Sequence, residues 1–120
     1  MIEPGTNAEV TLVVGESDSA IAHGSGDVPV LATPRVLALA EQAAVAALGE
    51  DLDSDQTSVG VHAEIHHVKA TRLDCAVTAR AEVAAVEGRR VLFEYRVTEG
   101  DEVVAYGTHQ RVIVARDRFA

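Results

Sequence analysis

The stretch from residue 35 to residue 48 constrains the fold most, because it reads as a helix with almost no polar surface. Thr33 is a favoured N-cap, Pro34 suits the first helical position, and Gly49 is a typical stop. Within this run the only polar residues are Arg35, Glu41 and Gln42. Such a helix is expected to be covered by other elements nearly all round.

The rest of the sequence alternates between apolar and polar residues with period two, which is typical of β-strands. One strand is predicted before the helix, over residues 8–14, followed by a Gly-, Ser- and Asp-rich loop over residues 15–29. Four strands are predicted after the helix, with tight turns at residues 87–89 and 99–101 and a central last strand over residues 103–114. This order predicts an α+β fold of the hotdog type, one long central helix wrapped by a five-stranded antiparallel sheet.

Length and composition limit the class of protein. With 120 residues the chain fits one domain, which we expect to span residues 1–120. The formal net charge of −9 disfavours nucleic acid or an anionic membrane as a partner, because both repel an acidic protein. Cys75 is the only cysteine, so no internal disulfide can form, and no segment is long enough to span a membrane. These features predict a cytoplasmic protein.

Glu41 is the first candidate for a functional residue. Its helical neighbours three and four positions away are all apolar: Leu37, Ala38, Ala44 and Val45. An ionised carboxylate there is costly to desolvate unless it is hydrogen-bonded or borders a cleft. The alternative is that Glu41 shares an exposed helix edge with Gln42 and has no function. Because the helix is otherwise so apolar, we favour the functional interpretation.

His67 and Thr33 are candidates for partners of Glu41. His67 is expected to point toward the helix and His66 away from it, because side chains alternate along a strand. The residues that share the parity of His67 are Val59, Val61 and Ile65. A lone histidine there is more often structural, but a facing carboxylate would complete an acid–base pair. Thr33 lies two helical turns before Glu41 on the same side, so besides capping the helix it could polarise a carbonyl or orient water.

No metal site is predicted. His62, Glu64 and His66 alternate along one strand face and could be imagined as ligands, but no fourth ligand or second cluster accompanies them. An exposed polar strand face is the simpler explanation.

Four short motifs in register resemble the fluoroacetyl-CoA thioesterase-like family of hotdog thioesterases. Residues 31–34, Leu-Ala-Thr-Pro, followed by Glu41 are similar to that family's Thr and Glu, eight residues apart on the central helix. Residues 67–71, His-Val-Lys-Ala-Thr, are similar to its catalytic His with the downstream Ala-Thr, and Gly60 falls on a strand glycine at its active site. Residues 107–111, Gly-Thr-His-Gln-Arg, are similar to the Gly-Thr-His-Glu-Arg of its last strand.

The resemblance implies an acyl-CoA thioesterase that hydrolyses a small acyl-CoA, or a related thioester, to free acid and thiol. It implies Thr33, Glu41 and His67 as the catalytic residues of a site shared between two subunits. The candidate substrate-binding residues are Gly60, Lys69, Arg72 and Arg111. Coenzyme A is part of the substrate, so no separate cofactor is expected. A homodimer or a dimer of dimers is expected, also because a small sheet curled round one helix leaves an edge and a cleft to cover.

The sequence departs from the family before Thr33. The family's longer segment there, with Phe residues that form a lid over the fluorine pocket, is replaced by a short loop over residues 24–30 without aromatic residues. Fluoroacetyl selectivity is therefore not predicted. Residues 72–74, Arg-Leu-Asp, also replace Pro, Pro and Gly. Two alternatives stay open: a non-catalytic acyl-CoA-binding hotdog domain, and a hotdog hydratase or dehydratase, whose motif is incomplete because no His follows residues 26–29.

Overall fold

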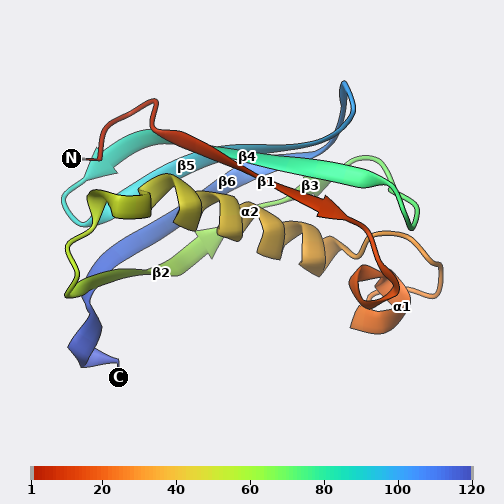
Figure 1. Ribbon diagram of the computed structural model, residues 1–120, viewed down its shortest axis with the longest axis horizontal. Helices are drawn as coiled ribbons and strands as arrows, with labels where there is room; N and C mark the ends of the chain where they lie inside the picture. The colour runs from red at the N-terminus through yellow and green to blue at the C-terminus, as the bar shows by residue number, and fades with distance from the viewer. Residues whose placement is uncertain (1, 120) are drawn as a thin grey trace.

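The computed structural model describes residues 2–119, in which an antiparallel sheet curls around one long helix (Figure 1). The helix, α2, spans Thr33–Leu48. The strands are β1 (Asn7–Val13), β2 (Gln56–Ala63), β3 (His66–His67), β4 (Ala76–Glu87), β5 (Arg90–Glu99) and β6 (Glu102–Ala115). They lie in the order β1-β4-β5-β6-β2, and β3 also pairs with β6. The predicted architecture is confirmed, with β3 as a short sixth strand.

The core lies between α2 and the inner face of the sheet. The buried residues of α2 are Val36, Leu39, Ala40, Ala43, Ala44, Ala47 and Leu48. They pack against the inward side chains of β4 and β5, among them Val77, Val83, Val91, Phe93 and Val97. Each fully buried Val, Leu or Phe contributes roughly 1.5–3 kcal/mol to folding. The many alanines of α2 let the helix axis approach the sheet closely, which fixes the position of every side chain that α2 carries.

One flank of α2 is uncovered, so the helix is covered on most sides but less completely than expected. Gln42, Val45 and Ala46 are exposed, and half of the surface of Val45 is accessible. Figure 1 shows the edge strands β1 and β2 on opposite sides of the helix. Val61 of β2 is also half exposed, because a bulge between Gly60 and His62 shifts the pairing with β6 and breaks the predicted alternation.

The connections are partly as predicted. Gly88 and Gly100 have φ angles of 65° and 59°, which suit the tight turns predicted there; each turn has two residues between its strands. The segment predicted as a loop before α2 contains two short helical turns instead, η1 (Glu16–Asp18) and α1 (Ala20–His23). Ser19 caps α1, since its hydroxyl accepts a hydrogen bond from the Ala22 N–H. Within residues 2–119, no helix has the length and apolar character that crossing a membrane requires.

Candidate functional site

Thr33 and His67 meet at the start of α2. The N-cap is Ala32, in an extended conformation, so Thr33 is the first helical residue and does not cap the helix, contrary to the prediction. Its Oγ1 lies 2.8 Å from Nδ1 of His67 instead, and either atom can be the donor, depending on the imidazole tautomer. His67 therefore points toward the helix, as its position in the strand predicts. Because Ala32 is the N-cap, the Thr33 hydroxyl does not cap the helix and contacts His67.

The His67 imidazole is partly buried, and burial lowers its pKa from the ordinary value of 6.5. The Lys69 backbone acts in the opposite direction with a smaller effect. The imidazole is therefore neutral at pH 7. Its Nε2 is buried and makes no hydrogen bond with the described residues. A neutral imidazole that contacts a hydroxyl at one nitrogen can exchange a proton with a reacting group at the other.

A pocket of about 310 Å³ adjoins the Thr33–His67 pair. Its walls come from the loop before α2 and from the segment around β3, and they include Ser25, Asp27, Val28, Val68 and Ala70. No aromatic side chain other than the His67 imidazole is among the described residues that line it. The volume lies at the lower end of the range for ligand pockets, which suits a small group.

Glu41 lies farther along α2, against β6. Its Oε2 accepts a hydrogen bond from Nη1 of Arg111 at 3.3 Å and lies 3.9 Å from Nε2 of His109. The Glu41 side chain is 42% exposed, whereas His109 and Arg111 are buried. The carboxylate thus borders the open flank of the helix and is hydrogen-bonded on its inner side, which explains how the apolar helix tolerates it.

The Arg111 guanidinium is held by further hydrogen bonds. Nε donates to the Ser58 hydroxyl at 2.8 Å, Nη2 donates to the Ser58 carbonyl at 3.1 Å, and Nη1 donates to Nε2 of His109 at 3.1 Å. Arg111 was predicted to bind substrate, with coenzyme A phosphates as its target. It is buried, and four of its five N–H groups are engaged, one of them with Glu41. Binding of a coenzyme A phosphate by Arg111 stays a prediction.

Gly60 lies directly beside this group. A Cβ at this position would lie 2.9 Å from Oε2 of Glu41, 3.1 Å from Cε1 of His109 and 3.4 Å from Nη1 of Arg111. Any larger residue would have to displace the carboxylate. The glycine therefore keeps space for Glu41 against the backbone of β2.

The predicted catalytic residues thus form two groups within one chain. Thr33 and His67 are one group, and Glu41 with Gly60 and Arg111 is the other. Among residues 2–119, no hydrogen bond or ion pair joins Glu41 to His67, so the expected pair is not formed within one chain. Eight helical residues correspond to about 12 Å along α2, a distance that one thioester group does not span.

Two predicted phosphate ligands lie near the first group. Lys69 lines the pocket beside Thr33 and His67, and its exposed ammonium pairs with Glu102, which raises the pKa of Lys69. Arg72 is exposed and forms an isolated bridge with Val30 in the loop before α2. Asp74, where the family has Gly, adopts a φ of 70°.

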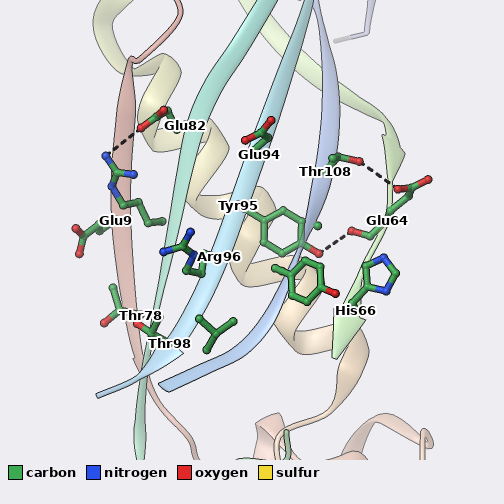
Figure 2. A pocket seen from close by; sticks show the side chains of 14 residues that line it. Glu9, Glu64, His66, Thr78, Glu82, Glu94, Tyr95, Arg96, Thr98 and Thr108 are labelled. Carbon is green, nitrogen blue, oxygen red and sulfur yellow. Dashed lines mark hydrogen bonds and ion pairs between the residues drawn. The ribbon is translucent and has the colours of Figure 1, made fainter. Parts of the chain in front are cut away.

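The outer face of the sheet carries a separate hollow of about 770 Å³ (Figure 2). The charged side chains that line it include Glu9, Arg80, Glu82, Glu94 and Arg96. None of the predicted site residues is among its lining residues within the described chain. His66 lies here, stacked on Tyr106, so it points away from the helix as predicted. Within the described range, no three His, Cys, Asp or Glu side chains are grouped to hold a metal ion.

The outer hollow also contains the contact that holds the break between β2 and β3. The Tyr95 hydroxyl donates to the Glu64 carbonyl at 2.7 Å (Figure 2). Burial raises the pKa of Tyr95 to about 12, so this hydroxyl stays protonated. Gly107 makes room for the Glu64 carbonyl, which a Cβ would meet. The break sets the position from which His67 reaches Thr33.

Sequence reasoning gave no role to His109 and missed Ser58. The signal for His109 was present, because it shares strand parity with Arg111, so two polar side chains occupy the inward face of β6. Ser58 carried no comparable signal. Its contact with Arg111 depends on the pairing of β2 with β6, which the sequence does not specify.

A helix wrapped by a sheet in this strand order, with polar groups along its open flank, defines a hotdog-fold protein. A family model described as fluoroacetyl-CoA-specific thioesterase matches residues 14–117, and the chain belongs to this family. The fluoroacetyl-CoA thioesterase of Streptantibioticus cattleyicolor is 32% identical over 90 residues, which cover 75% of this chain. The aligned part spans 65% of that relative's length.

Solved structures agree with this assignment. The fluoroacetyl-CoA thioesterase FlK superposes with a TM-score of 0.90 at 26% identity, covering 99% of this chain and 93% of FlK. A phenylalanine-to-alanine variant of FlK, solved in complex with fluoroacetate and CoA, also gives a TM-score of 0.90 at 26% identity, covering 99% of this chain and 100% of that chain. A hot-dog-like protein from Thermanaerovibrio acidaminovorans gives 0.87 at 29% identity, covering 98% of this chain and 93% of that chain.

Proposed function

We propose that the protein is a thioester hydrolase that cleaves a small acyl-CoA, or a related thioester, to free acid and thiol. The observation that carries this proposal is the Thr33–His67 pair beside a small pocket. The chain belongs to a thioesterase family, and its helix also carries a carboxylate, Glu41, that is hydrogen-bonded to Arg111. The pocket wall over residues 24–30 has no aromatic side chain, so the proposal does not include selectivity for fluoroacetyl-CoA.

The active site we propose is completed by a second copy of the chain. Thr33 and His67 of one protomer would act with Glu41 of the partner subunit, because the two groups are too far apart within one chain. The open flank of α2 and the edge strand β2 support this arrangement, since both expose apolar surface, at Val45 and Val61. A two-fold axis beside α2 would form two identical sites.

In the proposed reaction Glu41 acts as base for water or as nucleophile. As base, it takes a proton while the water oxygen bonds to the thioester carbon and the carbon–sulfur bond breaks. The proton that Glu41 took from the water passes by way of the His67 imidazole to the leaving thiolate, so the enzyme returns to its starting protonation state and the products are the acid and the free thiol. Thr33 hydrogen-bonds the reacting groups, and Gly60 lets the thioester oxygen approach the backbone. The scheme needs no metal or further cofactor.

A panel of short acyl-CoA thioesters tests the function. Purified protein is incubated with each thioester, and free thiol is measured against time. Release above the uncatalysed rate for at least one small acyl group is expected. Saturable binding of an acyl-CoA without thiol release would contradict the proposal and favour the non-catalytic binding domain.

Mixed dimers test the shared site. Two inactive variants, Thr33→Ala and Glu41→Gln, are co-expressed with different tags, and the heterodimer is purified. If the site takes Thr33 from one protomer and Glu41 from the other, one of the two sites is intact, and about half of the wild-type turnover returns. A heterodimer as inactive as its parents would contradict the arrangement, as would a monomeric mass by light scattering.

A further inference from the structure

Buried hydrogen bonds connect the backbone of β2 to Glu41 through two side chains of β6, and we call His109 and Arg111 together the Arg111 clamp. Nδ1 of His109 lies 2.8 Å from the His62 carbonyl, which can only accept. Nδ1 therefore carries the hydrogen. In the neutral ring Nε2 is then a bare acceptor, and it faces Nη1 of Arg111 at 3.1 Å. The His62 carbonyl thus fixes the tautomer that Arg111 requires.

The clamp uses both hydrogens of one guanidinium nitrogen. Nη1 of Arg111 donates to His109 and also to Oε2 of Glu41. Two further contacts to Ser58 fix the plane of the guanidinium. Oε2 is therefore held, whereas Oε1 of Glu41 has no hydrogen bond from any residue within the described range.

We propose that His109 is a positioning residue, a neutral acceptor that aims Arg111 at Oε2 of Glu41 and leaves Oε1 as the oxygen that acts on water or on the thioester. This inference rests on the proposed role of Glu41. His109 itself touches no substrate, because it is 2% exposed and lies behind Arg111.

The surroundings of His109 keep it neutral. Burial lowers its pKa most, and the Arg111 charge lowers it further, whereas the His62 carbonyl and Glu41 oppose these effects. The His62 side chain is the remaining titratable group that acts on it, and the face toward β5 is covered by the apolar Phe93 ring. Protonation at Nε2 would set an N–H against the N–H of Arg111 and break the clamp.

Two substitutions of His109 distinguish its hydrogen bond to Arg111 from its hydrogen bond to the His62 carbonyl of β2. His109→Gln can place its amide oxygen near the position of Nε2 and accept from Arg111. His109→Asn can place its amide nitrogen near Nδ1 and donate to the His62 carbonyl, but it offers Arg111 no acceptor. Since small misplacements of a reacting group can cost about 100-fold, we expect Asn to lower kcat roughly tenfold or more, and Gln to retain most of kcat. KM is expected to stay within about twofold, because substrate binding is not altered.

The control is His66→Gln on the outer face, which should leave kcat unchanged. If Asn retained more kcat than Gln at equal thermal stability, His109 would anchor β2 and the inference would be wrong. The nitrogen-15 shifts of His109 give a readout that needs no substrate: a neutral Nδ1–H tautomer at pH 7 is expected, and an Nε2–H tautomer would overturn the clamp. If the wild type showed the Nδ1–H tautomer of His109 but cleaved no thioester, the proposed function would be wrong, whereas the hydrogen-bond arrangement of the clamp would be supported.

Discussion

The Thr33–His67 pair and the Arg111 clamp differ in how firmly the protein holds them. The pair rests on one side-chain hydrogen bond, between an exposed threonine and a half-buried histidine beside an open pocket. The clamp is buried and joins β2, β6 and α2 through several hydrogen bonds. In the proposed active site the pair can therefore adjust to a bound thioester, whereas the clamp would be organised before substrate arrives, as electrostatic catalysis requires.

The largest effect on kcat is expected when the carboxylate that the clamp holds is removed. Glu41→Gln keeps the shape of the side chain and can still accept from Arg111, but it can neither take a proton nor attack. Loss of a general base lowers turnover by about 10²–10⁴-fold, and we expect this loss in kcat. Thiol release measures it. Glu94→Gln, the same chemical change at an exposed carboxylate on the outer face of the sheet, is the control and should keep full activity. A purified Glu41→Gln with wild-type turnover would contradict the assignment.

The next largest effect on kcat is expected when Oε2 of Glu41 is displaced but not removed. The methyl group of Gly60→Ala would lie 2.9 Å from that oxygen, at the flexible end of a side chain, so the carboxylate moves and the fold is kept. A displacement of this kind costs roughly 10- to 100-fold in kcat. Thermal unfolding should show a small change only. At Gly15 a Cβ meets its nearest neighbour at an ordinary 3.6 Å, so Gly15→Ala is the matched control. Equal kcat for the two variants would show that the approach of Glu41 to β2 is not needed.

Local patterns predicted most of the fold, because they depend on residues close in sequence. The apolar run of α2 and the glycine turns needed no knowledge of the sheet. The candidate pairing of His67 with Glu41 is not formed within one chain because His67 contacts Thr33 at the start of α2, and Glu41 lies about two helical turns beyond Thr33. The capping prediction for Thr33 was wrong because an N-cap and a first helical residue differ only in whether that residue's own backbone is extended or helical, and here Ala32 is the extended residue.

The clamp could not be predicted from the sequence. It depends on the bulge between Gly60 and His62, which sets the pairing of β2 with β6. A shift of one residue would send every side chain of a strand to the other face, so without the register the partner of Arg111 stays unknown. The exposure of Val61 has the same cause. The motifs of the last strand pointed to Arg111 but did not reveal its contact with Glu41.

The pH dependence compares the two groups through their histidines. Burial lowers the pKa of both His67 and His109 below 6.5. The unfolded chain therefore binds protons at a higher pH than the folded chain, so their contribution to stability is complete above pH 6.5 and is lost as the pH falls below it. Turnover is expected to fall at lower pH than stability begins to, because it follows the lowered pKa of the folded protein; the fall is about tenfold per pH unit once one histidine is protonated. Urea unfolding and kcat are measured between about pH 5 and pH 8.

The pH profile of a variant shows whether His67 or His109 causes the fall in kcat at low pH. If His109 causes it, His109→Gln should shift the fall in kcat to lower pH, because an amide does not titrate. If His67 causes it, the profile of that variant should match the wild type. A wild-type kcat that stays constant or rises as the pH falls would contradict a role for a neutral imidazole in either group.

The smallest effect lies at the mouth of the pocket, next to the Thr33–His67 pair. The Lys69 ammonium is held by Glu102, so if Lys69 binds a phosphate of coenzyme A as predicted, that phosphate competes with the Glu102 carboxylate. Both side chains are about half exposed, and ion pairs of this kind are weak. Glu102→Gln should therefore lower KM for the best acyl-CoA by only about two- to threefold, with kcat unchanged. The same acyl group on N-acetylcysteamine, which lacks phosphate, should show no change. An equal decrease in KM for both thioesters would mean that Lys69 does not meet the phosphates, and that Glu102 acts on the pocket itself.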